Sequence, residues 1–439
     1  MSGQADAEPL SWRALLALLL AMFAISVGYG IVLPILPFLV GRLAGTNDPV
    51  IQSWHTGLVT GTYILAIFLF APVWGKLSDR WGRRPVILLG LTGFASSVAL
   101  FGSIESLPVL YLGRFLDGLF AAAIAPVTYA LVGTHSPSKE WQARRFVLIS
   151  IAGTAGFFAG PLLGGAVLQA SRLLNPEAIE IYSLPFFAAS ILALAAAAAV
   201  WNLVPGTDQL QRNRSSSVGT HRDPKVILRL YIVAFVTAGA IGAFEVGLAL
   251  RGKQILEMDA TRIGMMFAEC SLVMFVAQAI VFSPIIKPEN TRWLLTPGLA
   301  VLALGLVFVP FTSTPMTLSI AVALVAASAG ILSPIATYWA SLNAGERQGA
   351  DLGRMTASAS LGQALGSAAG GLLFDTPLLP GSAFTVTAVI VLVGAIASLG
   401  LPQLLVRPLI SLSHKSSGSD DDANRQATTR ALRHPHEHG

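Results

Sequence analysis

The chain has 439 residues, of which 54% are hydrophobic and only 12% are charged. Soluble domains carry about a quarter charged residues, so this composition excludes an ordinary soluble protein and indicates a chain that crosses a membrane many times. The net charge of +5 comes from loops and the C-terminal tail. Because no basic, aromatic-lined groove accompanies that charge, we expect no nucleic-acid partner.

Apolar runs of roughly the 20 residues needed to cross a bilayer recur along the whole chain. They predict an all-α membrane protein with twelve transmembrane helices, at about 12–40, 54–74, 85–104, 107–132, 146–168, 184–204, 229–250, 263–283, 293–311, 316–342, 355–374 and 382–406. The first run is too long for the core of a cleavable signal peptide.

A polar interval divides the twelve expected spans into two sets of six. We therefore expect a six-helix bundle at 12–204, a cytoplasmic linker at 205–228 and a second six-helix bundle at 229–406, with polar tails at 1–11 and 407–439. The halves also repeat at an offset of about 207 residues, as the parallel repeat of some transporters does. The glycines that repeat are Gly156, Gly160, Gly164 and Gly165, matched by Gly362, Gly366, Gly370 and Gly371.

The distribution of Lys and Arg sets the expected orientation. These residues are concentrated in the loops after spans 2, 4, 6, 8 and 10 and are sparse in the loops on the other side. Positively charged loops stay in the cytoplasm, so we expect both termini there and the protein in the inner (cytoplasmic) membrane.

Neither cysteine nor histidine predicts a metal site. The single cysteine, Cys270, lies inside an expected span, which excludes an intramolecular disulfide. The histidines near the C-terminus, His434, His436 and His438, lie on a polar tail, where such residues are usually incidental. We expect no metal and no cofactor.

A charged segment punctuated by glycine separates spans 2 and 3, and it reads Gly75-Lys76-Leu77-Ser78-Asp79-Arg80-Trp81-Gly82-Arg83-Arg84. The glycines permit a sharp turn, the cations favour the cytoplasm, and Asp79 can accept hydrogen bonds from an arginine or a helix N-terminus. The segment resembles the signature loop of the major facilitator superfamily of secondary transporters, which implies a role in the cytoplasmic gate. The residues that carry the resemblance are Gly75, Leu77, Asp79, Arg80, Gly82, Arg83 and Arg84. The alternative is a generic positive loop, which requires neither the glycines nor the aspartate.

Span 5 holds glycines at spacings of four, which form a smooth helix face for close packing, together with a proline. The string resembles the motif that this superfamily links to antiporters, and that resemblance implies export. As a plain packing face it would say nothing about direction. The residues concerned are Gly156, Gly160, Pro161, Gly164 and Gly165.

Ionisable side chains inside expected spans are candidate functional residues because burying a charge in a membrane is costly. Arg114 and Asp117 lie three apart on one helix face, and the Arg-x-x-x-Gly pattern resembles the family motif associated with proton coupling. Glu245 and Glu269 lie at a similar depth in the outer half of the membrane, judged by helical rise. If spans 1, 4, 7 and 10 line the cavity as in that family, Glu245 faces Arg114 and Asp117. The alternatives are a structural ion pair for the first two and hydrogen bonds to neighbouring helices for the acids.

The resemblance, which includes the proline-containing span 1 typical of twelve-span drug:proton antiporters, implies a monomeric exporter that exchanges a small amphipathic molecule for protons. A proton-coupled importer and a non-transporting membrane receptor remain the alternatives. We expect no enzyme, since the chain has neither a phosphate-binding loop nor a hydrolase motif, and the proton gradient is the expected energy source. The residues expected at the cavity suit an apolar or weakly cationic cargo and are Tyr29, Phe115, Tyr129, Tyr338 and Trp339.

Overall fold

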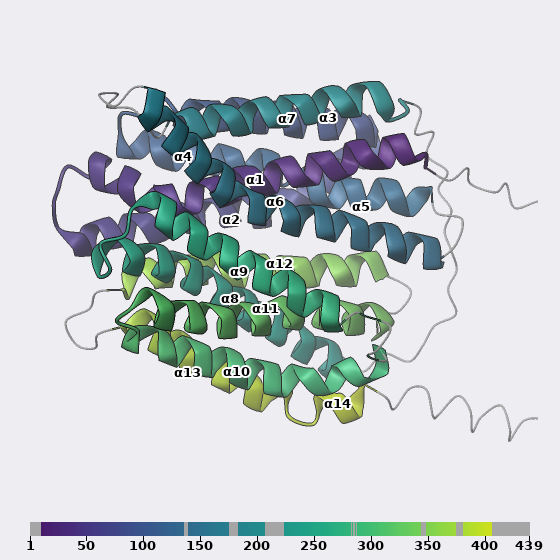
Figure 1. Ribbon diagram of the computed structural model, residues 1–439. Coiled ribbons are helices and arrows are strands. Elements are labelled where there is room, and N and C mark those ends of the chain that lie inside the picture. Colours follow the sequence, from purple (N-terminus) through teal and green to yellow (C-terminus); the bar gives the residue numbers. More distant parts are fainter. Residues whose placement is uncertain are drawn as a thin grey trace, which may run out of the picture.

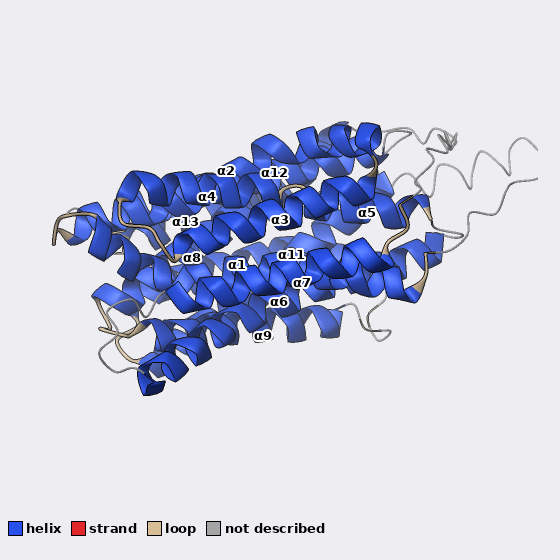
Figure 2. Cartoon of the chain, turned by 90° about the horizontal axis from the view of Figure 1, so that it is seen from above, coloured by secondary structure: helices blue, strands red, loops and turns tan. Residues whose placement is uncertain are grey.

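The structure is a computed structural model that describes residues 10–135, 139–174, 183–206, 224–281, 283, 286, 288–343, 348–374 and 381–405. Helices make up this part of the chain, and no strand occurs in it (Figures 1 and 2). The expected C-terminal tail, with its four histidines, lies outside the described residues, as does most of the expected linker.

Seven helices form the first half of the chain, which occupies the upper part of Figure 1. They are α1 (Trp12–Leu43), α2 (Pro49–Trp81), α3 (Arg83–Phe101), α4 (Leu107–Ala121), α5 (Ile124–Thr134), α6 (Lys139–Leu174) and α7 (Ser183–Leu203). The fourth expected span is thus two helices, α4 and α5, separated by a turn at Ala122 and Ala123.

The second half lies below the first in the same view. It consists of α8 (Pro224–Gln254), α9 (Ala260–Val281), the 3-10 helix η1 (Pro288–Leu294), α10 (Leu295–Phe308), the 3-10 helix η2 (Val309–Phe311), α11 (Pro315–Asn343), α12 (Gln348–Leu372), α13 (Ser382–Ser398) and the short α14 (Leu401–Leu404). Helix α8 begins at Pro224, inside the interval expected to be linker.

Within the described residues, eleven segments are helical, long and apolar enough to cross a membrane. The remaining expected span, 355–374, corresponds to α12, which is helical but rich in Gly, Ala and Ser and falls short of the hydropathy of the others. The physical reason is its position: α12 packs against both α8 and α2, so small residues that allow close approach replace the bulky apolar residues of a lipid-facing helix.

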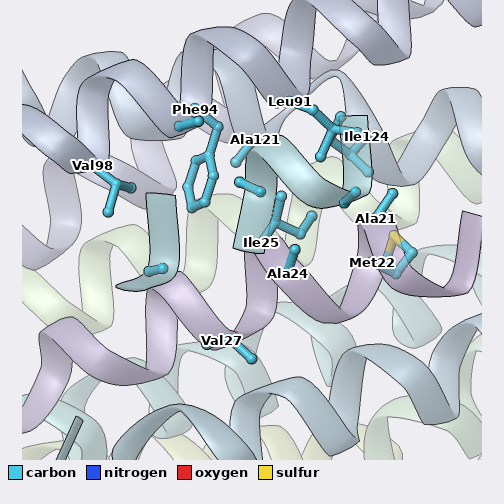
Figure 3. Packing of buried hydrophobic residues seen from close by; sticks show 14 of the residues in the cluster. Ala21, Met22, Ala24, Ile25, Val27, Leu91, Phe94, Val98, Ala121 and Ile124 are labelled. Atoms are coloured by element: carbon cyan, nitrogen blue, oxygen red, sulfur yellow. The ribbon is translucent and has the colours of Figure 1, made fainter. Parts of the chain in front are cut away.

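Each half of the chain has its own hydrophobic core. The first is built from α1 to α7 and receives only Ala260 and Ala364 from the second half, whereas the second is built from α8 to α14 and receives Leu33 from α1. In the first core, the Phe94 side chain points toward α1 (Figure 3), and a Cβ on Gly28 of α1 would lie 2.6 Å from the Phe94 ring. Two bundles with separate cores can move relative to each other without disrupting either core.

Glycine backbones hold the central helices together in both halves. A Cβ on Gly156 would lie 2.4 Å from the Phe23 carbonyl oxygen of α1, and one on Gly362 would lie 2.2 Å from the Phe235 carbonyl oxygen of α8. Helices α6 and α1 therefore pack as α12 and α8 do, which is the spatial form of the sequence repeat.

Helices α6 and α12 also contact the opposite bundle. Pro161 of α6 contacts Gly264 of α9, while Gly371 of α12 lies against Gly57 of α2, where an added Cβ would come within 2.7 Å of the Gly57 Cα. Figures 1 and 2 show α6 beside α9 along the boundary between the bundles. The glycine face of each helix thus serves the bundle and the boundary at once.

We predict that Gly160→Leu impairs function while Gly164→Ala is tolerated, although both residues belong to the same sequence motif. A Cβ at Gly160 would lie 2.7 Å from the Val27 carbonyl oxygen, which is backbone and cannot yield, whereas a Cβ at Gly164 would meet only Ile31 at 3.5 Å. We expect Gly160→Leu to lower stability by about 1–3 kcal/mol, measured by thermal unfolding in detergent. Equal stability of the two variants would contradict this packing.

Candidate functional site between the bundles

A cavity of about 260 Å³ lies between the two bundles. One residue of α1 and three of α6 line it from the first half, and α8, α9 and α11 line it from the second. The lining residues are Tyr29, Gly153, Thr154, Phe157, Ile241, Phe244, Glu245, Cys270, Met274, Val325, Ala326 and Ala329. The wall is therefore mainly apolar and aromatic, with few polar groups, as small-molecule sites usually are.

Among the residues that the structure describes, Glu245 is the only acidic one that lines this cavity. It is 6% exposed, and the Tyr29 hydroxyl donates a hydrogen bond to its Oε2 atom at 2.7 Å. The Gln363 amide donates to the same oxygen at 3.4 Å. Because Tyr29 belongs to α1 and Glu245 to α8, the shorter bond joins the two bundles beside the cavity.

Arg114 and Asp117 form a salt bridge of 3.7 Å and are almost fully enclosed, at 1% and 0% exposure. The guanidinium lies over the Tyr63 ring, 4.4 Å from its centroid, and 5.8 Å from the centroid of Tyr29. Tyr29 and Tyr63 are themselves stacked. Tyr29 thus contacts both Arg114 and Glu245, whereas neither Arg114 nor Asp117 is among the residues that line the cavity.

Several polar atoms of this pair lack hydrogen-bond partners within the described residues: Nε and Nη2 of Arg114 and both carboxylate oxygens of Asp117. A buried ion pair recovers the cost of desolvation only when further hydrogen bonds complete it. Within the described residues, the compensation for burying these two charges comes from their ion pair and from the contact of the Arg114 guanidinium with the Tyr63 ring.

Other residues predicted for the site lie elsewhere. Glu269 accepts a hydrogen bond from Ser319 of α11 at 2.8 Å and is not among the residues that line the cavity. Phe115 packs against Phe70. The three remaining aromatic residues form contacts within their own bundles, namely Tyr129 with Phe146, Tyr338 with Trp339, and Trp339 with Thr291.

Of the five predicted cavity residues, only Tyr29 lines the cavity that the structure shows. The expected lining by spans 1, 4, 7 and 10 also changes, because α6 and α9 contribute while α4 does not. A sequence signal existed for the α6 residues: Gly153, Thr154 and Phe157 lie at helical spacing from the glycines that pack on α1. Because α6 packs against α1 in one bundle and α9 in the other, the helix face beside its glycines borders the cavity between the bundles.

The signature segment is much less of a loop than the sequence predicts. Helix α2 continues to Trp81 and α3 begins at Arg83, so Gly82 alone separates them. Gly82 has φ 91°, a conformation that favours glycine. Gly75 lies inside α2, so it does not form the expected sharp turn, and a Cβ on it would meet no atom within 4 Å.

Some charged residues of the segment form hydrogen bonds with their own bundle, and others are exposed to solvent. Arg84 donates to the Trp201 carbonyl oxygen and lies over the Trp201 ring, and Arg83 donates to Thr134, while Leu77 packs on the first core. Asp79 and Arg80 are exposed, and no hydrogen bond or ion pair to Asp79 is present in the described part of the chain. The arginines therefore fasten α3 to its own bundle and leave Asp79 available.

No group of three His, Cys, Asp or Glu residues within the described chain is placed to hold a metal ion. The chemistry of the site is that of one carboxylate, its tyrosine and amide donors, and a buried ion pair. Such groups can exchange protons or bind a cation.

The fold and the site together define a multi-pass membrane protein made of two helical bundles with a substrate-sized cavity between them. A family model described as Major Facilitator Superfamily matches residues 18–350. The chain belongs to the Major Facilitator Superfamily.

The relatives described below align with most of this chain and with most of their own length. Tetracycline resistance protein, class C, of Escherichia coli is 30% identical over 337 residues, which cover 73% of this chain and 79% of that protein. Multidrug resistance protein 2 of Bacillus subtilis (strain 168) is 27% identical over 374 residues, covering 82% and 88%. Among solved structures, a bacterial homolog of the human lysosomal transporter Spinster, described as inward-facing and unoccupied, superposes with a TM-score of 0.70 at 14% identity, covering 93% of this chain and 99% of that chain.

We predict that Asp79→Asn leaves folding unchanged and slows transport about tenfold or more, since a single charged hydrogen bond is worth about 1.5–3 kcal/mol. Asp79 has no partner within the described residues here, so removing its charge cannot destabilise this conformation, and its effect must fall on another one. Thermal unfolding and turnover in reconstituted vesicles measure the two quantities. Glu105→Gln, which neutralises an exposed acid outside the signature segment, serves as the control, and normal turnover of Asp79→Asn would remove Asp79 from the gate.

Proposed function

We propose that this protein is a secondary active transporter that exports a small amphipathic molecule, with a cationic or apolar character, in exchange for protons. The printed names of the relatives, which concern tetracycline and multidrug resistance, support efflux. The cavity of about 260 Å³ with its Phe, Met and Tyr walls supports a cargo of that kind. The proton gradient supplies the energy without a cofactor, and the protein acts as a monomer with no catalytic activity of its own.

The observation that carries the proposal is the position of Glu245. It lines the cavity, and its hydrogen bond with Tyr29 crosses from one bundle to the other. An ionised carboxylate in apolar surroundings is neutralised by a proton or by a cationic ligand. A proton taken up by Glu245 changes the hydrogen bond that joins the bundles beside the cavity, so protonation is coupled to cargo movement without the cargo having to bind the carboxylate oxygens.

The orientation we propose follows the positive-inside rule: the signature segment and both termini face the cytoplasm of a bacterial inner membrane. The contacts between the bundles that involve Gly57 and Gly371, or Pro161 and Gly264, lie in the half of the molecule away from that segment. In this orientation these contacts close the bundles on the external side, as both an inward-facing and an occluded stage of alternating access require.

Inverted membrane vesicles test the direction. With an acidic lumen imposed, an exporter should accumulate tetracycline inside the vesicles, and dissipating the gradient with a protonophore should stop the accumulation. A proton-coupled importer would instead release preloaded tetracycline under the same gradient. A receptor without transport activity would leave the distribution unchanged in both experiments.

We predict that Glu245→Gln reduces gradient-driven export by about tenfold or more while tetracycline binding stays within about threefold of wild type. The amide still accepts the Tyr29 hydrogen bond but cannot exchange a proton. Glu269→Gln is the matched control, because its carboxylate is bonded to Ser319 away from the cavity, and it should export normally. Proton release on addition of tetracycline distinguishes loss of coupling from loss of binding.

Asp117→Asn separates two roles within the first bundle. If Asp117 exchanges protons, the variant folds normally and loses proton release, as Glu245→Gln does. If Asp117 only neutralises Arg114, the variant leaves a buried guanidinium unpaired and lowers stability by about 3–5 kcal/mol. Full coupled transport by both Glu245→Gln and Asp117→Asn would refute this site as the proton carrier.

A further inference from the structure

Two hydrogen bonds join α1 of the first bundle to α8 of the second, and the two bonded pairs have the same separation in sequence. Tyr29 donates to Glu245 at 2.7 Å, and the Lys253 ammonium donates to the Pro37 carbonyl oxygen, also at 2.7 Å. Both pairs are separated by 216 positions in sequence. Along each helix the second bond follows the first by about 12 Å of rise. Helices α1 and α8 are therefore parallel neighbours with one contact at the cavity and another nearer the end opposite the signature segment.

The surroundings of Lys253 form a built site for an ammonium group. Its Nζ atom also donates to the Gln52 side-chain oxygen of α2 at 3.2 Å and lies 5.3 Å from the centroid of the Phe38 ring. A Cβ on Gly41 would lie only 2.6 Å from Nζ, so the glycine leaves the space that the ammonium fills. Within the described chain no carboxylate forms a salt bridge with Lys253; groups of the first bundle hold it.

The neighbouring Gln254 extends the contact. Its amide donates to the Pro49 carbonyl oxygen at 3.2 Å and to the Ser53 hydroxyl at 3.1 Å, both in the first turns of α2. The last turn of α8 is thus fastened to α1 and α2 together. A cation at the C-terminus of a helix is further favoured by the helix dipole.

We propose that Lys253 is a positioning residue. Its hydrogen bonds keep the two bundles together at the end opposite the signature segment, called here the Lys253 end, and thereby hold Tyr29 against Glu245. When the bundles part at this end, the contact of Lys253 with Pro37 must break before α1 and α8 can separate at the depth of the cavity. The hydrogen bond between Tyr29 and Glu245 is in this way coupled to closure of the Lys253 end of the bundles. The inference rests on the proposed function only in assuming that this end opens during a transport cycle.

The single cysteine of the chain provides the test, because Cys270 lines the cavity. A membrane-impermeant thiol reagent, applied to vesicles of either orientation, reports the side from which the cavity is reached. We expect Lys253→Met to raise the rate of Cys270 modification from the Lys253 side about tenfold, the effect of losing one charged hydrogen bond. Gly41→Val should do the same, because it displaces the ammonium and leaves the charge in place.

Two control variants sharpen the result. Arg262→Met removes an exposed cation near the same end whose side chain forms no hydrogen bond or ion pair within the described residues, so it should label at the wild-type rate. Lys253→Arg keeps a donor and should label more slowly than Lys253→Met. The proposed role of Lys253 is refuted if folded Lys253→Met and Gly41→Val both label at the wild-type rate, or if Arg262→Met labels as fast as they do. The labelling experiment does not depend on transport. Absence of efflux in the vesicle experiment would therefore contradict the proposed export and not the proposed role of Lys253.

Discussion

A carboxylate enclosed in apolar surroundings needs a partner, and the arrangement of both bundles depends on how Glu245 obtains one. Its strongest donor is the Tyr29 hydroxyl at 2.7 Å, which belongs to the other bundle. Transfer of an unpaired charge out of water is so unfavourable that the bundles, a proton or a cationic ligand must supply compensation. The same physical constraint thus links the occupancy of the cavity to the distance between the bundles.

That link requires two rigid bodies, and glycine packing supplies them. Helix α6 follows α1 so closely that a Cβ at Gly156 or Gly160 would overlap backbone atoms, and α12 follows α8 in the same way at Gly362 and Gly366. Backbone contacts of this kind cannot adjust as flexible side chains do. Close backbone contacts also join α12 to α2 across the boundary at Gly371 and Gly57, so movement of one bundle relative to the other has to separate these contacts.

The two ends of the boundary differ in chemistry. At one end, Lys253 and Gln254 donate to carbonyl and amide oxygens of α1 and α2. At the other, Asp79 is exposed at the end of α2, while Arg83 and Arg84 are engaged with their own bundle. In the conformation described, the polar groups of one end are satisfied across the bundles and the acid of the other end is not. This asymmetry is what an alternating cycle requires of one of its stages.

The sequence by itself determined the class of protein and the repeat and indicated which charges are buried, because hydropathy, small-residue spacing and isolated acids in apolar runs are local properties. Of the residues that it singled out, Glu245 and Tyr29 line the cavity and the other four aromatic residues do not, and residues 75–84, expected as a turn, are mostly helical. Only the tertiary structure decided that α6 and α9 line the cavity, that Glu269 turns to Ser319, and that Lys253 meets Pro37. These outcomes depend on the rotation of each helix about its axis and on contacts between bundles, which are set by packing of residues distant in sequence.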